Sequence, residues 1–361
     1  MKLKSLTLCL LFGALFVSCI KDELPNAEAD ILTCIVPSEI LIRDPVIEND
    51  KITIRVKSTD LTNMAPEFTL TPGATIVPAS GTARDFTMPQ EYVVTSEDGN
   101  WHKTYTVIFI YEGLSTQYSF EDMKLQQDKY PVFFERNGDK VIMDWASGNI
   151  GYAILGMAAS PEEYPTAQGA DGVIGKCLKL STRSTGGMGA MMNMPMAAGN
   201  LFIGTFDAMS ALSNPLKATQ FGLPFYYEPT RLTGYYKYEA GKDFTEGGII
   251  VPGKKDIFDI YAIFYETDEV TKTLDGTNTF THPNLISIAR ISNAKETKEW
   301  VRFSLPFVYL PGKSVDKAKL AAGKYNLAIV FASSLEGAKF NGAFGSTLQI
   351  DEVRLLYNEN K

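Results

Sequence analysis

Polar and apolar residues alternate through much of the chain from residue 35 onward, which is the pattern of half-buried β-strands. Residues 51–56 alternate strictly, and residues 91–95 and 103–109 flank the acidic, glycine-containing sequence 97–100. Such a turn between two β-rich segments indicates a β-hairpin. Short strands at this spacing predict a small antiparallel β-sandwich over residues 35–112.

Residues 113–361 continue the β pattern over a longer segment, with Gly- and Pro-rich loops between the strands. Only residues 315–322 keep a helical period, so we expect one short helix there. About nine strands predict a double-sheet jelly roll, and the predicted fold class is all-β. The strand candidates are 119–121, 175–180, 201–206, 232–239, 257–266, 285–291, 300–305, 325–331 and 347–356.

The first 18 residues combine Lys2 and Lys4 with a short apolar segment and end at Ser18. This pattern is typical of a secretory signal and is too short for a membrane-spanning helix. Its ending resembles a bacterial lipobox, in which Cys19 becomes the lipidated first residue. The alternative is an ordinary signal peptide with an incidental cysteine.

Residues 19–34 are charged and lack periodicity, which predicts a tether. Within them, residues 20–23 (Ile-Lys-Asp-Glu) resemble the surface-export tag of lipoproteins from polysaccharide-foraging Gram-negative bacteria. The alternative is that these charges only keep the tether solvated. We expect a lipid-anchored protein of the outer membrane that is exposed at the cell surface.

Charge and composition limit the class of partner that the protein is expected to bind. The net charge of −8 argues against nucleic acid, because phosphate binding needs a basic face. Hydrophobic residues make up 45% of the chain and charged residues 21%, which indicates a globular protein. Cys9 leaves with the signal peptide, so Cys34 and Cys177 remain beside Cys19. Cys34 and Cys177 fall in different predicted domains, and we expect two separate buried thiols.

The sequence gives little support for a catalytic centre. The chain has two histidines, His102 and His282, no Gly-x-Ser-x-Gly motif and no His/Cys cluster with zinc spacing. A glycosidase needs only a pair of carboxylates, and 42 acidic residues offer many candidate pairs. The enzyme alternative therefore stays open without a motif that favours it.

Acidic residues open and close the larger domain. Glu121 lies near its start and Asp351 near its end, and the first and last strands of a sandwich commonly lie side by side. Phe120 and Val353 would then point into the core while the acids point outward. Two carboxylates with nearby carbonyl groups suit a structural Ca²⁺ ion, and the alternative is that both acids are simply solvated.

Aromatic residues form the other candidate site. Along one strand Tyr236 and Tyr238 share a face, while Tyr235 and Lys237 share the opposite one. Sugars stack on aromatic rings and need flanking polar groups. We therefore predict a ligand face, and the alternative is that the rings belong to the sandwich core. The predicted ligand-binding residues are Trp145, Asn149, Tyr226, Tyr235, Tyr236, Lys237 and Tyr238.

Several segments carry a resemblance to known families. Residues 92–99 and 103–107 resemble the last hairpin of bacterial Ig-like repeats. Phe120-Glu121, residues 145–149, residues 234–238 and the closing Ile-Asp-Glu-Val together resemble the putative carbohydrate metabolism domain. The resemblance implies a β-sandwich similar to carbohydrate-binding modules, found in lipoproteins of glycan-degrading bacteria, and it implies no particular reaction.

The predicted architecture is a signal peptide (1–18), a tether (19–34), an Ig-like domain (35–112) and a jelly roll (113–361). The predicted function is capture of a poly- or oligosaccharide by a surface lipoprotein. Its expected partners are the glycan, the membrane through the anchor, and outer-membrane transporter or glycosidase components. A glycoside hydrolase or lyase on the same domain and a structural or adhesive subunit are the alternatives.

Overall fold

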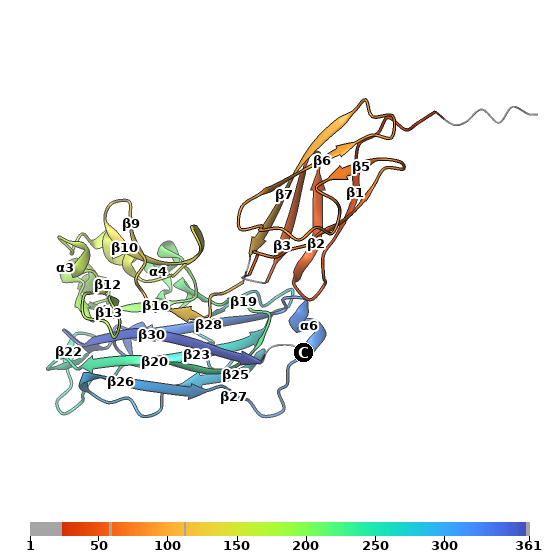
Figure 1. Cartoon of the computed structure of the whole chain (residues 1–361). Helices are drawn as coiled ribbons and strands as arrows, with labels where there is room; N and C mark the ends of the chain where they lie inside the picture. The colour runs from red at the N-terminus through yellow and green to blue at the C-terminus, as the bar shows by residue number, and fades with distance from the viewer. Residues whose placement is uncertain (1–23, 58–59, 112, 359–361) are drawn as a thin grey trace, which may run out of the picture. The chain divides into compact units, whose positions relative to one another are not determined.

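The computed structural model describes residues 24–57, 60–111 and 113–358. These fall into two compact units, each described here by itself (Figure 1). The smaller unit comprises the described parts of residues 1–37, 45–54 and 61–109. The larger unit takes residues 38–44, 55–60 and the chain from residue 110 onward, close to the predicted junction at residue 112. Cys19 and the predicted signal peptide lie outside the described residues.

A five-stranded sheet and a two-stranded sheet form the N-terminal sandwich. β6 (Gln90–Thr95) and β7 (His102–Tyr111) pair antiparallel, which confirms the predicted hairpin. The side chains of Ile52, Ile54, Val94 and Val107 are fully buried, so the alternation seen in the sequence does separate core from solvent. The sheet order is β2 (Leu41–Glu48), β3 (Lys51–Val56), β7, β6, β5 (Thr75–Val77), and β1 (Ile31–Ile35) pairs with β4 (Glu67–Leu70).

The larger unit is a sandwich of two sheets, which confirms the all-β prediction (Figure 1). The order of the first sheet is β12 (Thr166–Gly169), β13 (Cys177–Ser181), β30 (Thr347–Asn358), β20 (Glu228–Glu239), β26 (Thr297–Pro306). The order of the second is β16 (Asn200–Phe202), β28 (Tyr325–Ala332), β23 (Asp259–Glu266), β25 (Leu285–Arg290), β27 (Val308–Tyr309). Neighbouring strands in both sheets run antiparallel.

The core of the larger unit lies between these two sheets. The first sheet contributes Leu232, Ile350 and Val353, and the second contributes Phe264 and Ile329, all of them fully buried. β23 and β28 are buried on nearly every residue, since smaller elements cover the outer face of their sheet. This explains why both strands are continuous apolar runs instead of alternating sequences.

The first and last strands of the larger unit do pair, as predicted: β8 (Gln117–Tyr118) lies beside β30. The strand predicted at residues 119–121 was wrong. β8 ends at Tyr118, and Phe120 adopts a left-handed backbone conformation (φ 56°) that no regular strand contains. Phe120 and Val353 are nevertheless buried, as expected.

Short helices and small sheets decorate the sandwich. α6 (Lys317–Ala321) confirms the predicted helix, and Asp316 caps it by accepting the Ala318 and Lys319 N–H groups. Four further short helices were missed, because one or two turns leave no measurable period: α2 (Asn149–Leu155), α3 (Gly186–Met191), α4 (Ala208–Ser213) and α5 (Pro215–Ala218). No helix among the described residues is long and apolar enough to span a membrane.

Three small sheets and one hairpin complete the larger unit. They are β9 (Met123–Gln126), β10 (Tyr130–Asn137) and β11 (Lys140–Asp144); β17 (Gly204–Phe206), β18 (Thr219–Phe221) and β24 (Leu274–Asp275); β21 (Phe244–Glu246), β22 (Ile249–Ile250) and β29 (Gly342–Ala343); and the β14 (Arg183–Ser184)–β15 (Met196–Ala197) hairpin. β19 (Leu223–Pro224) pairs with β28.

Both remaining cysteines are free and buried, which confirms the prediction of two separate thiols. Burial raises the pKa of Cys34 to about 12 and that of Cys177 to about 11. A thiol with so high a pKa is hardly ionised at neutral pH, so burial suppresses the reactivity of both cysteines.

Candidate functional site

Most of the predicted ligand residues lie in the core. Trp145 is 2% exposed, and its ring packs against Tyr118, Phe120 and Phe331. Its indole N–H donates to Glu135 Oε1 at 2.8 Å. Both the ring faces and the polar edge of Trp145 are therefore occupied within the protein, and the prediction that this ring stacks on a sugar is corrected.

The same correction applies to four other predicted residues. Tyr236 and Tyr238 are 4% and 2% exposed and sandwich Phe258, with ring centroids 4.8 and 4.7 Å away. Tyr226 is also buried. Asn149 is fully buried. Its side-chain NH₂ group donates to the backbone carbonyls of Pro131 and Thr166, and its Oδ1 accepts the backbone N–H of Thr166. These side chains hold the sandwich together, because their polar tips are satisfied or enclosed.

Tyr235 and Lys237 behave differently, because they lie on the outer face of β20 and are partly exposed. The register sets Tyr235 opposite Arg302 of β26, and Lys237 opposite Gln349 of β30. Gln349 in turn lies opposite Lys179 of β13. The predicted division of β20 into two faces is therefore confirmed, with only its outer side accessible.

Trp300 is the residue that the sequence prediction missed. It lies on β26, is partly exposed and does not belong to any core cluster. The Lys237 ammonium lies 4.9 Å from the centroid of its ring. Alternation along β26 places Trp300 and Arg302 outward while Phe303 and Leu305 are buried, which was the available signal.

We call this surface the open face, and it consists of Lys179, Tyr235, Lys237, Trp300, Arg302 and Gln349. Its side chains span four neighbouring strands, or roughly 14 Å at about 4.8 Å per strand. Among the described residues, Lys179, Lys237 and Arg302 have no carboxylate partner. The open face therefore offers two rings, three cations and one amide within reach of a ligand.

Asp351 lies on β30 in the middle of this sheet, opposite Tyr235, and Glu121 follows β8; the two carboxylates hold one loop. Asp351 Oδ2 accepts the N–H groups of Val173 and Ile174 at 2.6 and 3.1 Å, and its Oδ1 accepts the N–H of Glu352. Glu121 Oε1 accepts the N–H of Lys176 at 2.8 Å. Asp351 is fully buried, which corrects the expectation that it points to solvent.

These contacts bear on the predicted Ca²⁺ ion. Both oxygens of Asp351 accept N–H groups, which already satisfies part of their acceptor capacity without an ion. No group of three or more His, Cys, Asp or Glu side chains able to hold a metal occurs among residues 24–57, 60–111 and 113–358. The residues present thus fit a hydrogen-bonded loop better than a metal site, and Ca²⁺ stays a prediction.

Four carboxylates in the described part of the larger unit carry raised pKa values: the buried Asp256, Asp259 and Asp351, and the partly exposed Glu135. Burial raises the pKa of Asp351, although hydrogen bonds from three backbone N–H groups oppose it. Burial raises the pKa of Glu135 to about 7, partly opposed by the hydrogen bond from Trp145. Burial also raises the pKa of Asp256 and Asp259, although hydrogen bonds oppose it. Asp259 pairs with Arg290 at 2.7 Å, and Asp256 accepts four hydrogen bonds. The side chains of Asp256 and Asp259 therefore stabilise the fold, and neither belongs to the open face.

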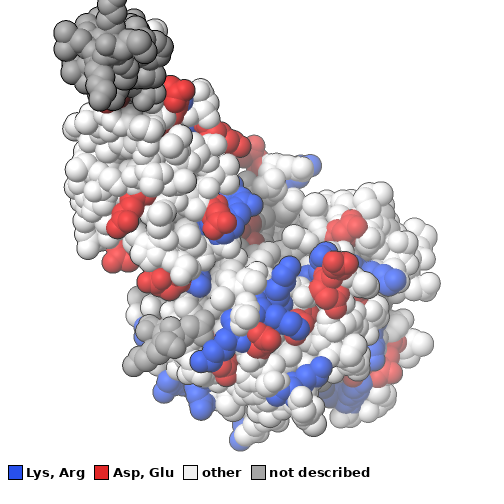
Figure 2. Space-filling model, turned by 90° about the vertical axis from the view of Figure 1, so that its right-hand side faces the viewer, with Lys and Arg blue, Asp and Glu red and all other residues white. Residues whose placement is uncertain are grey.

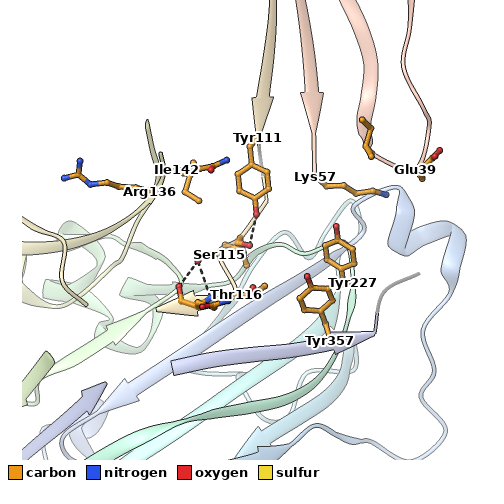
Figure 3. Close-up of a pocket in the computed structure, with 13 residues that line it drawn as sticks. Glu39, Lys57, Tyr111, Ser115, Thr116, Arg136, Ile142, Tyr227 and Tyr357 are labelled. Carbon is orange, nitrogen blue, oxygen red and sulfur yellow. Dashed lines mark hydrogen bonds between the residues drawn. The ribbon is translucent and has the colours of Figure 1, made fainter. Parts of the chain in front are cut away.

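Another aromatic pair, Tyr227 and Tyr357, is partly exposed at the end of the first sheet (Figure 3). Their ring centroids are 4.6 Å apart at an interplanar angle of 34°, and both rings contact Phe225. Both also pack against the main core cluster. The pair therefore extends the core, and we assign no ligand to it.

Positive and negative side chains are mixed on one face of the larger unit. On the face of the molecule shown in Figure 2, lysine and arginine side chains of the larger unit lie beside aspartate and glutamate. This face therefore carries no continuous basic surface of the kind that binds nucleic acid. The cations of the open face act locally, next to its rings.

Comparison with known proteins shows the family to which the larger unit is related. Residues 119–356 match the family model described as the putative carbohydrate metabolism domain. The chain belongs to this family. Residues 42–108 match the model described as SGBP, N-terminal. Both matches confirm the resemblances drawn from the sequence. No curated protein matches the chain.

Two solved structures are similar over long segments. A putative glycoside hydrolase from Bacteroides thetaiotaomicron VPI-5482 is 62% identical, covering 94% of this chain and 100% of that one, with a TM-score of 0.69. A putative glycoside hydrolase from Bacteroides vulgatus ATCC 8482 is 45% identical, covering 68% of this chain and 100% of that one, with a TM-score of 0.65. The open face therefore belongs to the carbohydrate metabolism domain of this chain, as do Glu121 and Asp351.

Proposed function

We propose that the protein is a lipid-anchored surface protein that binds a poly- or oligosaccharide through the open face of its carbohydrate metabolism domain. The observation that carries the proposal is the partly exposed Trp300 ring beside the Lys237 ammonium, with Tyr235 on the neighbouring strand. A sugar ring stacks its C–H face on an aromatic ring, and its hydroxyl groups need donors and acceptors around that ring.

The arrangement supplies those polar groups at suitable places. Lys237 and Arg302 donate on either side of the two rings, and Gln349 both donates and accepts. The row runs across four strands, so it suits an extended chain of several sugar units better than one unit held in a deep pocket. Binding by such a shallow surface is weak per molecule and becomes useful when many tethered copies act together.

Anchoring rests on Cys19, which lies outside the described residues. A lipidated cysteine would hold the domain at the outer membrane, where the expected transporter and glycosidase components work. Cys19→Ala should abolish incorporation of a radiolabelled fatty acid into the protein, while Cys34→Ala should leave it unchanged. Continued labelling of Cys19→Ala would remove the anchor from the proposal.

The binding test uses an array of plant and microbial polysaccharides, followed by titration of the best ligand. Trp300→Ala should weaken binding at least about tenfold, which corresponds to about 1.4 kcal/mol. Trp101→Ala is the matched control, because Trp101 is 63% exposed on the smaller unit and lies outside the open face. Equal binding by both variants would refute the open face as the site. A blank array would favour a structural or adhesive role.

A glycosidase is the second candidate, because both similar solved structures are described as putative glycoside hydrolases and Glu135 has a raised pKa. A raised pKa is what a general acid needs. Its nearest acidic neighbour, Asp122, is paired with Arg136 at 3.2 Å. Release of reducing sugar by the wild-type protein, lost in Glu135→Gln, would establish this activity; no release by the wild type would exclude it for the glycans used.

A further inference from the structure

A hollow of about 330 Å³ lies among the loops at one end of the larger unit and shares no residue with the open face. One wall comes from the β14–β15 hairpin and α3, and the other from the β21–β22 turn and the segment after β29. In Figure 1, α3 and β22 lie together at the end opposite α6. The residues that matter here are Ser184, Ala190, Asn193, Gly247, Gly248 and Phe344.

The lining carries no charged side chain but does carry hydrogen-bonding groups. Ser184 Oγ accepts the N–H of Gly186 at 3.1 Å, which leaves its O–H free to donate. The carboxamide of Asn193 makes no hydrogen bond to the rest of the described chain, so its acceptor and both donors are available. Lys254, on the segment after β22, already pairs with Glu246 and Glu336 at 2.7 and 2.6 Å. The lining itself therefore offers no counter-charge to a charged ligand.

Phe344 stands at the edge of this hollow with 45% of its surface exposed. Its backbone is fixed on both sides, because Ala343 N–H donates to Asp256 Oδ2 at 2.8 Å and Gly345 N–H donates to the Thr182 carbonyl at 2.9 Å. Asp256 also accepts the hydroxyls of Ser334 and Ser346 at 2.6 and 2.7 Å. An apolar ring is thus held in water by a rigid buried network, which is the arrangement of a preorganised contact.

Glycines shape the rest of the wall that carries Phe344. Gly247 and Gly248 both have left-handed backbones, with φ of 54° and 84°, and a Cβ on Gly248 would approach Pro195 to 3.6 Å. Two adjacent residues without side chains leave the backbone itself facing the hollow. Met188 and Met191 are exposed on α3 and lie outside the lining of the hollow, so their methyl groups can report on binding there without taking part in it.

We infer that this hollow is a second binding site, which takes one or two uncharged sugar units at a chain end or branch. Its volume lies at the low end of the range of about 300 to 1,000 Å³ for small-molecule sites. Phe344 would stack on the apolar face of the sugar, while Ser184 and Asn193 would bond its hydroxyls.

The test uses the protein as cells produce it, solubilised in detergent and labelled with ¹³C at the methionine methyl groups. The signals of Met188 and Met191 are assigned by Met→Leu variants and followed during titration with glucose, galactose, mannose and arabinose, with glucuronate as the charged comparison. At least one neutral sugar should shift at least one of the two signals saturably. Glucuronate should bind at least about tenfold more weakly than that sugar.

Two variants separate the hollow from the rest of the surface. Phe344→Ala removes the ring, and Ala190→Leu fills the hollow from an exposed helical position that tolerates leucine. Each should weaken the sugar at least about tenfold, whereas Leu335→Ala, which truncates an equally exposed apolar residue outside the lining, should not. Trp300→Ala should also leave this titration unchanged. Absence of shifts with every neutral sugar, or unchanged binding in both hollow variants, overturns the inference while the array result for the open face stands.

Discussion

Tyr235 and Tyr236 are neighbours on one strand, yet they have opposite roles. Tyr236 is 4% exposed and packs against Phe258, whereas Tyr235 faces outward opposite Arg302. The same contrast separates the two tryptophans of the domain, since Trp145 is enclosed by three rings and Trp300 is partly exposed beside Lys237. An aromatic residue in a sandwich is thus a core residue or a ligand residue according to which sheet face it occupies, and its type alone does not decide this.

The largest expected effect comes from removing an inward ring. Tyr236→Ala should lower the free energy of unfolding of the larger unit by about 3 to 5 kcal/mol, because it leaves a ring-sized cavity in the core. Tyr235→Ala should change it by less than about 1 kcal/mol, because its ring is on the outer face. Urea unfolding of both variants measures this difference. Equal destabilisation would show that the two faces of β20 do not differ as described.

The buried environment of Trp145 should also appear as pH dependence. Burial raises the pKa of Glu135 to about 7, above its ordinary value near 4.5, so the folded state holds a proton that the unfolded state releases. The stability contributed by this group is fully present below about pH 4.5 and is lost as pH rises towards 7, by at most about 3 kcal/mol.

Glu135→Gln removes this titration and serves as the comparison. Its unfolding free energy should depend less on pH between 5 and 8 than that of the wild type, while its amide still accepts the Trp145 N–H. Unfolding curves taken across this pH range measure the difference. Parallel pH profiles for the two proteins would mean that Glu135 titrates at its ordinary value.

The carboxylate of Asp351 tests what holds the neighbouring loop in place. Asp351→Ala should cost about 2 kcal/mol, because the N–H groups of Val173 and Ile174 lose their acceptor inside the protein. If the carboxylate works only through these bonds, EDTA and added calcium should leave the melting temperature of the wild type unchanged. A rise with calcium that disappears in Asp351→Ala would instead establish the predicted ion.

The smallest expected effect is the loss of glycan affinity when Lys237, on the outer face of β20, is substituted. Lys237→Met keeps the apolar stem of the side chain beside Trp300 and removes the ammonium donor. It should weaken glycan binding by about 1 kcal/mol or less and leave stability unchanged. Lys140→Met is the control, because Lys140 is exposed on β11 and far along the chain from the open face. Titration calorimetry with the array's best ligand distinguishes the two.

Much of the fold followed from local pattern. The hairpin at residues 90–111 and the helix after Asp316 were predictable, because turn chemistry and helical periodicity act over a few residues. The pairing of the first and last strands of the larger unit was predicted instead from the usual arrangement of sandwich folds. The short helices α2 to α5 were not predictable, since they depend on what the sandwich packs against them.

The sequence by itself determined that β20 has two faces and that Tyr235 and Lys237 share one of them, because side chains alternate along any strand. Only the tertiary structure decided which face is covered, since that depends on the second sheet, whose residues lie far away in the chain. For the same reason, the tertiary structure alone shows that Trp145 and Asn149 are buried and that Trp300 lies beside Lys237. It also shows that Asp351 accepts N–H groups from a loop almost 180 residues earlier in the chain.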